Sequence, residues 1–375
     1  MLAGFVVASC GGGDDGNDGQ SPDPPPPGLT GGWSTDFSQH SVPLSEFIGG
    51  GPPKDGIPSI DDPKFVTTGK ADDFLADGEP VAVLEIGGQT RLYPIQILVW
   101  HEIVNDEVGG EPVAVTYCPL CNSTVAFERT VDGEVLDFGT TGRVRKSDLV
   151  MYDRQTESWW QQLTAEAVVG ELTGKRLEIV PSGILSWGEA RRTYPDAEVL
   201  SRDTGAERDY GSSPYPGYDD PDSEPFLLEE EADSRLPAKT RVTSIATGDG
   251  SAVVYPLETL RRRAPLNDRV AGRPVVILFD PDVVSALDGV GISSSRQVGA
   301  AAVFDRRVAG RTLTFEKSGE AGTTRDRQTG TTWDIAGKAL DGPLAGDRLR
   351  RVVSDDQFWF AVAAFLTEVE IRTNG

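Results

Sequence analysis

The sequence predicts an α+β, β-rich protein made of two related, mostly antiparallel β units with a few short helices. One observation is a series of short apolar runs separated by turn residues, of which Asp132-Gly133 is the strongest hairpin signal. The other is an internal repeat, because Tyr93-Pro94 and Asn105-Asp106 recur 162 positions later as Tyr255-Pro256 and Asn267-Asp268. We therefore expect two copies of one scaffold.

The amino terminus predicts an export signal. Residues 1–10 are apolar, and Val7-Ala8-Ser9-Cys10 resembles a bacterial lipobox, in which the cysteine is acylated after cleavage. No basic segment precedes this run, so a free thiol at Cys10 is the alternative. Residues 11–32 are rich in Gly, Asp and Pro, which is typical of a disordered tether. We expect an extracytoplasmic protein, periplasmic or at the cell surface, with a lipid anchor in a bacterial membrane.

The remaining segments follow in chain order. Residues 33–79 are predicted to be loop-rich, and residues 80–205 to form the first β-rich unit, with a buried helix over 95–104. Residues 206–239 are acidic and rich in Pro and Tyr, which indicates either a linker or a loop laid over the first unit. Residues 240–375 predict the second unit.

Charge excludes one class of partner. The chain has 59 acidic and 35 basic residues and a formal net charge of −24, which repels phosphate backbones. We therefore expect no nucleic-acid partner. No segment has the roughly 18 consecutive apolar residues that a membrane span requires, so the lipid anchor is the expected membrane contact. No motif indicates a particular protein partner.

Reactive side chains concentrate in the first unit. Cys118 and Cys121 form the only Cys-x-x-Cys, and His101 is one of two histidines in the chain. Two thiolates and an imidazole suit Cu(I) or Zn²⁺. The sequence thus predicts a copper or zinc site on these three residues, with Met151 and Glu102 as candidate auxiliary groups. Asp148 and other acids of this unit have no spacing that singles out a catalytic pair.

Two alternatives remain open for the cysteines. They could perform thiol-disulfide exchange, since a cysteine at a strand end followed by Pro and a second cysteine is typical of such motifs. They could instead form a structural disulfide in a scaffold without chemistry. The second unit has Arg263, Asp280 and Val283 at the positions that correspond to His101, Cys118 and Cys121. This difference favours a site that belongs to the first unit alone, and whether the protein is an enzyme stays open.

Several long strings resemble a known family. They are Gly50-Gly51-Pro52-Pro53-Lys54-Asp55-Gly56-Ile57-Pro58, Trp100-His101-Glu102-Ile103-Val104-Asn105-Asp106, Tyr117-Cys118-Pro119-Leu120-Cys121-Asn122 and Ser147-Asp148-Leu149-Val150-Met151-Tyr152-Asp153-Arg154-Gln155-Thr156. On these strings the chain resembles the bacterial family catalogued as domain of unknown function 3179. The resemblance implies a bacterial protein that is often exported. It implies no established activity and supplies no catalytic residues.

Overall fold

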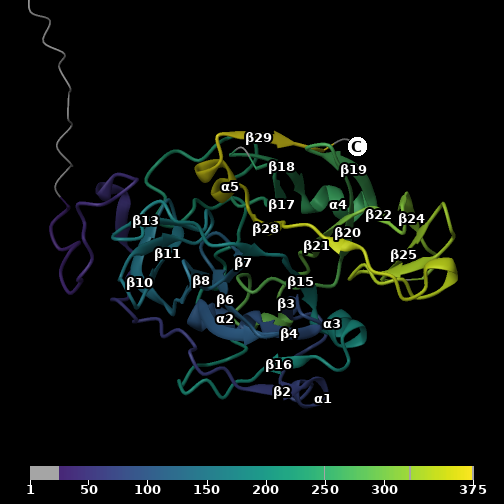
Figure 1. Cartoon of the computed structure of the whole chain (residues 1–375), viewed down its shortest axis with the longest axis horizontal. Helices are drawn as coiled ribbons and strands as arrows, with labels where there is room; N and C mark the ends of the chain where they lie inside the picture. The colour runs from purple at the N-terminus through teal and green to yellow at the C-terminus, as the bar shows by residue number, and fades with distance from the viewer. Residues whose placement is uncertain (1–24, 249, 321, 374–375) are drawn as a thin grey trace, which may run out of the picture.

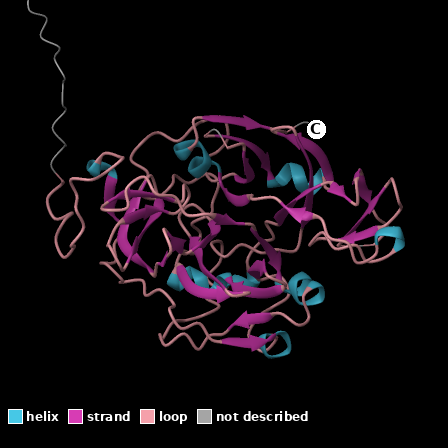
Figure 2. Cartoon of the chain, viewed as in Figure 1, coloured by secondary structure: helices cyan, strands magenta, loops and turns pink. Residues whose placement is uncertain are grey.

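The structure is a computed structural model that describes residues 25–248, 250–320 and 322–373 (Figure 1). The predicted lipobox with Cys10, and the tether up to residue 24, lie outside the described residues. Within the described ranges, no helix combines the length and the apolar character needed to cross a membrane. Strands dominate and the helices are short (Figure 2), as the sequence predicts.

The segment 33–79 holds only short elements. They are η1 (Leu44–Glu46), β1 (Phe47–Gly49), β2 (Phe65–Thr67) and α1 (Thr68–Ala71).

The first half follows from residue 80. Its elements are β3 (Pro80–Ile86), β4 (Gln89–Pro94), α2 (Ile95–His101), β5 (Ile103–Val108), β6 (Glu111–Cys118), β7 (Ser123–Glu128), β8 (Thr130–Val131), β9 (Glu134–Val135), β10 (Phe138–Arg145), β11 (Asp148–Asp153), β12 (Trp159–Gln161), β13 (Glu166–Val169), β14 (Ile179–Val180), β15 (Ser182–Ser186), α3 (Trp187–Thr193) and β16 (Glu198–Leu200).

The second half begins at residue 241. Its elements are β17 (Arg241–Ala246), β18 (Ser251–Pro256), α4 (Leu257–Arg263), β19 (Leu266–Val270), β20 (Arg273–Asp280), η2 (Ile292–Ser294), β21 (Ala300–Asp305), β22 (Arg307–Val308), β23 (Arg311–Thr312), β24 (Phe315–Lys317), β25 (Thr323–Asp326), β26 (Thr332–Asp334), η3 (Gly342–Leu344), β27 (Arg350–Arg351), β28 (Asp355–Phe358), α5 (Trp359–Phe365) and β29 (Glu368–Ile371).

Turn chemistry sets the hairpins. Gly87 and Gly88 join β3 to β4 with positive φ angles of 58° and 84°. Asp132 and Gly133 join β8 to β9 with φ angles of 51° and 88°. Left-handed backbone at both central residues matches the right-handed twist of the flanking strands, which explains the preference for Gly and Asp there. The turn at Asp132 and Gly133 lies where the sequence predicts it.

The predicted helix over 95–104 is too long. In the structure α2 ends at His101, and Glu102 takes a φ of 59°, which stops the helix. Residues 103–108 then pair with β6 as strand β5. A continuous apolar run has no periodicity that separates a buried helix from a buried strand, so the boundary was not visible in the sequence.

The two halves share their strand order. One sheet of the first half runs β15-β3-β4-β16-β2 and its counterpart runs β28-β17-β18-β29, with β16 and β29 parallel to β4 and β18. A second sheet runs β14-β7-β6-β5, and its counterpart runs β27-β21-β20-β19. Equivalent buried hydrogen bonds join Trp160 to Asp153 and Trp333 to Asp326. Descent of both halves from one ancestral unit stays a prediction.

The halves pack into one body. Strand β28 pairs with β17 of its own half and also packs against β7 of the first half, while β15 packs against β21 (Figure 1). One hydrophobic core joins Phe358 and Phe360 to residues of the first half, and another joins Trp187 to Phe304. The predicted units therefore bury apolar surface against each other as well as internally.

A tyrosine–aspartate hydrogen bond that recurs in both halves offers a test of how the halves differ in stability. Tyr93 Oη donates to Asp106 Oδ2 at 2.6 Å, and Tyr255 Oη donates to Asp268 Oδ2 at 2.8 Å. Asp268 also accepts from Arg372 Nη1 at 2.9 Å, so it keeps a partner when the tyrosine is changed. We expect Tyr93→Phe to lower the free energy of unfolding by about 2 kcal/mol and Tyr255→Phe by about 1 kcal/mol or less. Urea unfolding measures both; equal losses would contradict the expectation.

Candidate functional site

Two cysteines and one aspartate meet in the core of the first half. The Cys118 and Cys121 sulfurs and a carboxylate oxygen of Asp148 all lie within 4.8 Å of one another, and all three residues are buried. Cys118 ends β6 and pairs with Ser123 at the start of β7, so the turn between these strands carries both thiols. Asn122 completes this turn with a φ of 54°. The turn therefore fixes the spacing of the two sulfurs.

Asp148 reaches the thiols from another sheet. It begins β11, directly after a turn in which Lys146 and Ser147 have φ angles of 52° and 61°. Its Oδ1 accepts from Cys121 Sγ at 3.1 Å, and its Oδ2 accepts from Gln161 Nε2 at 2.5 Å. These contacts leave the carboxylate oriented toward the sulfur atoms.

A second chain of hydrogen bonds supports the thiol of Cys121. Its Sγ lies 3.1 Å from Ser123 Oγ, which donates to Gln162 Oε1 at 2.8 Å. Gln162 Nε2 in turn donates to Thr116 Oγ1 at 3.0 Å. All three supporting residues are fully buried. Their bonds position the side chains around the sulfur before any ligand binds.

Burial controls the protonation of these groups. It raises the pKa of Cys118 and raises that of Cys121 well above the ordinary thiol value. It also raises the pKa of Asp148 to about 6, against the opposing effect of the hydrogen bonds from Cys121 and Gln161. The isolated cluster therefore holds its thiol protons at neutral pH.

Glu102 adds a fourth acid. It directly follows α2 and is 7% exposed, and its carboxyl group forms no hydrogen bond within the described part of the chain. Burial, and after it the negative charge of Asp148, raise its pKa to about 8. No basic side chain of the described ranges forms an ion pair with Glu102 or Asp148. The site thus gathers acids in the core without a cation from the chain, an arrangement that is costly unless they stay protonated or a cation binds.

The structure places His101 elsewhere. Its Nδ1 lies 2.7 Å from Pro58 O and its Nε2 lies 2.6 Å from Tyr210 Oη, and the ring is not part of the thiol cluster. Burial lowers the pKa of His101, which favours the neutral ring that donates to one of these partners and accepts from the other. Asp148, and not His101, therefore lies with the two cysteines in the cluster that could hold a metal, because the ring at the end of α2 points toward two loops.

Comparison with known families places the chain. A family model described as "Protein of unknown function (DUF3179)" matches residues 54–369. The chain belongs to this family. The match confirms the resemblance stated from the sequence and spans both halves, including the thiol cluster. Comparison with proteins of curated function and with solved structures found no match.

A tyrosine-rich segment covers the site of this DUF3179 protein. The Tyr210 contact with His101 and a bond from Trp100 Nε1 to Ser212 O at 3.1 Å hold residues 206–239 on the first half. Tyr218 Oη donates to Leu120 O, between the two cysteines, at 2.8 Å. The sequence left open a linker or a loop laid over the first unit; in the structure the segment contacts both halves, since Ser213 N also donates to Val290 O at 2.8 Å. The segment therefore contributes to the burial of the thiols.

The other predicted residues have mixed outcomes. Glu102 lies next to the end of β6, since Tyr117 N, directly before Cys118, donates to Glu102 O at 2.8 Å. Met151 is fully buried in the same hydrophobic core as the cysteines, and a thioether role for it stays a prediction. The sequence analysis assigned Asp148 no partner residue. Because 27 residues separate it from Cys121, no local spacing in the sequence indicates that the two side chains meet. Only the folded chain reveals that pair.

Glu102 predicts a pH dependence of stability. Its folded pKa of about 8 exceeds the ordinary 4.5, so the folded state holds the proton more tightly than the unfolded chain. The resulting stabilisation is complete below pH 4.5 and is lost as the pH rises to about 8. We expect Glu102→Gln to flatten this part of the pH profile of the metal-free protein, measured by urea unfolding. The matched control is Glu107→Gln, at an exposed position, which should keep the wild-type slope.

Proposed function

We propose that this DUF3179 protein is an extracytoplasmic metal-binding protein that holds zinc at Cys118, Cys121 and Asp148. The observation that carries the proposal is the convergence of three acidic ligand atoms within 4.8 Å in a core that pairs them with no cation. A divalent ion would neutralise most of the charge that forms when these ligands deprotonate. The cluster could hold a metal; that it binds one, and that the metal is zinc, is the proposal.

The ligand types favour zinc over copper. Zn²⁺ accepts thiolate sulfur and carboxylate oxygen in one tetrahedral site, whereas Cu(I) prefers sulfur and imidazole. Asp148 supplies oxygen at the place where the sequence predicted the imidazole of His101. Three protein ligands leave a fourth position for water or another small ligand, and Glu102 stands near enough to affect the charge there.

Compartment chemistry supports the same proposal. The predicted export signal would place Cys118 and Cys121 in an oxidising space, where free thiols are unusual. Both cysteines are free and buried in the structure. A bound metal would keep such a pair reduced, since each thiol gives up its proton and shares the sulfur electrons with the ion.

Thiol-disulfide exchange is the second candidate. The Cys121 Sγ to Asp148 Oδ1 contact at 3.1 Å favours it, because the carboxylate could accept the thiol proton before the sulfur attacks a disulfide. Against it stand the complete burial of Cys121 and the raised pKa of both thiols, since exchange needs an accessible thiolate.

Elemental analysis of the protein purified from its own compartment tests the proposal. We expect about one zinc per chain, because the cluster offers one set of three ligand atoms. Cys118→Ser and Asp148→Asn should each lose most of the metal because each removes a ligand. His101→Gln is the matched control and should keep it, since the ring bonds Pro58 and Tyr210 instead.

The outcomes separate the candidates. Metal-free protein with a disulfide that a thioredoxin-type reductant opens would replace the proposal with thiol-disulfide exchange. Metal-free protein whose disulfide resists reduction until the chain unfolds would indicate a scaffold with a structural crosslink. Full metal content in Asp148→Asn together with metal loss in His101→Gln would restore the ligand set predicted from the sequence.

Lipid anchoring at Cys10 is tested separately. In the native bacterium, Cys10→Ser should abolish incorporation of labelled palmitate and move the protein from the membrane fraction to the soluble fraction, because the acylated thiol is the proposed anchor. Cys118→Ser should leave the label unchanged. Unaltered membrane association of Cys10→Ser would contradict the anchor.

A further inference from the structure

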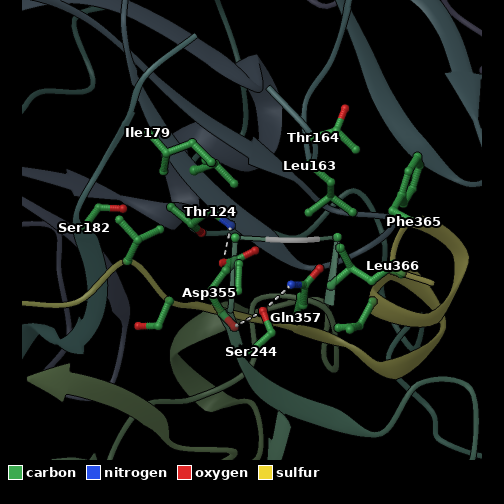
Figure 3. A pocket seen from close by; sticks show the side chains of 18 of the residues that line it. Thr124, Leu163, Thr164, Ile179, Ser182, Ser244, Asp355, Gln357, Phe365 and Leu366 are labelled. Atoms are coloured by element: carbon green, nitrogen blue, oxygen red, sulfur yellow. Dashed lines mark hydrogen bonds between the residues drawn. The ribbon is translucent and has the colours of Figure 1, made fainter. Parts of the chain in front are cut away.

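A cavity of about 330 Å³ lies where the two halves meet (Figure 3). Most of its wall is apolar. The first half contributes Leu163 and Ile179, and α5 and the residue after it contribute Val362, Phe365 and Leu366. A cavity of this size and character is typical of sites for small molecules.

Two side chains that line the cavity each have one buried oxygen atom without a hydrogen-bond partner in the described part of the chain. Asp355 Oδ1 accepts from Thr124 N at 3.1 Å, but its Oδ2 is buried and forms no hydrogen bond within the described ranges (Figure 3). Gln357 Nε2 donates to Ser244 Oγ at 2.8 Å, and its Oε1 is equally buried and unpaired. Gln357 is only 5% exposed. Unpaired buried acceptors are costly, and a ligand that donates hydrogen bonds would satisfy both.

The charge around Asp355 favours a cation. Burial raises its pKa, and the negative charges of Asp356 and Asp148 raise it further. The one arginine that lines the cavity, Arg176, is largely exposed and already pairs with Glu166 at 2.6 Å. The described part of the chain therefore brings no positive group to the Asp355 carboxyl.

The corresponding position of the first half is built differently. Asp355 and Gly183 each stand four residues before the tryptophan that begins α5 or α3. At Gly183 a Cβ atom would meet the guanidinium of Arg351, so a side chain there would require this arginine to move. The guanidinium of Arg351 thus occupies this position in the first half, whereas the second half has the acid Asp355 and the cavity there.

We propose that this cavity binds a small organic cation, a primary amine with an apolar body. The ammonium group would donate to Asp355 Oδ2 and Gln357 Oε1, and its positive charge would return the carboxyl to the ionised form. The apolar body would lie against Leu163 and the α5 side chains, where its burial supplies most of the affinity. The proposal does not depend on the metal site, because none of the three metal ligands lines the cavity.

Ligand selectivity of the full chain tests the proposal. We would titrate the protein with hexylamine, hexan-1-ol and hexanoate, which share a body and differ in the head group, and follow binding by calorimetry. We expect hexylamine to bind at least about tenfold more tightly than hexan-1-ol, and hexanoate to bind most weakly. Equal binding of the amine and the alcohol, or tighter binding of hexanoate, would overturn the proposal without any variant.

Variants locate the binding. Asp355→Asn should remove the preference for the amine over the alcohol, and Leu366→Trp should weaken both by filling the cavity. Glu166→Gln, which changes an acid paired to Arg176 at the rim, is the matched control and should keep the wild-type selectivity. If a folded Asp355→Asn protein, verified by circular dichroism, kept the preference, the amine would bind elsewhere and the proposal would fail.

Discussion

The contact between β28 and β7 is the constraint on which the rest of the structure depends. The backbone N–H of Phe358 donates to Cys121 O at 2.9 Å, so the second half holds the turn that carries the thiols. The same approach brings Asp355 to Thr124 and creates the wall of the cavity between the halves. Burial of the cysteines and enclosure of the cavity are thus two results of one packing arrangement.

The two halves solve the problem of a buried acid in different ways. Asp280, which takes the place of Cys118 in the second half, accepts hydrogen bonds from Ser186 N at 2.9 Å and Ser186 Oγ at 2.8 Å. The first half instead brings two thiols and Asp148 together with Glu102 nearby, and within the described ranges no basic side chain pairs with the two carboxyl groups. The arrangement of the first half leaves ligand atoms available, whereas that of the second half does not. We therefore expect the chemistry in the first half.

Contacts with the segment that covers the thiols explain the position of His101. His101 Nδ1 donates to the carbonyl of Pro58, so Nε2 accepts from Tyr210 Oη, and Trp100 and Leu120 contact the same segment. His101 therefore ties the covering segment to the end of α2, and this structural role does not require a bond from the ring to a metal. A residue of a reactive type can be needed near a site for positioning alone.

Local patterns in the sequence determined the β-rich class, the turns at Gly87-Gly88 and Asp132-Gly133, and the closeness of Cys118 to Cys121, because each depends on neighbouring residues. Longer strings of residues determined the family. The internal sequence repeat also indicated that the two halves share their strand order. Only the tertiary structure decided that Asp148, and not His101, lies beside the two cysteines. It also decided the position of the covering segment. Those features depend on contacts between residues far apart in the chain, and on burial, which sets the pKa values of the acids and which no spacing of residue types encodes.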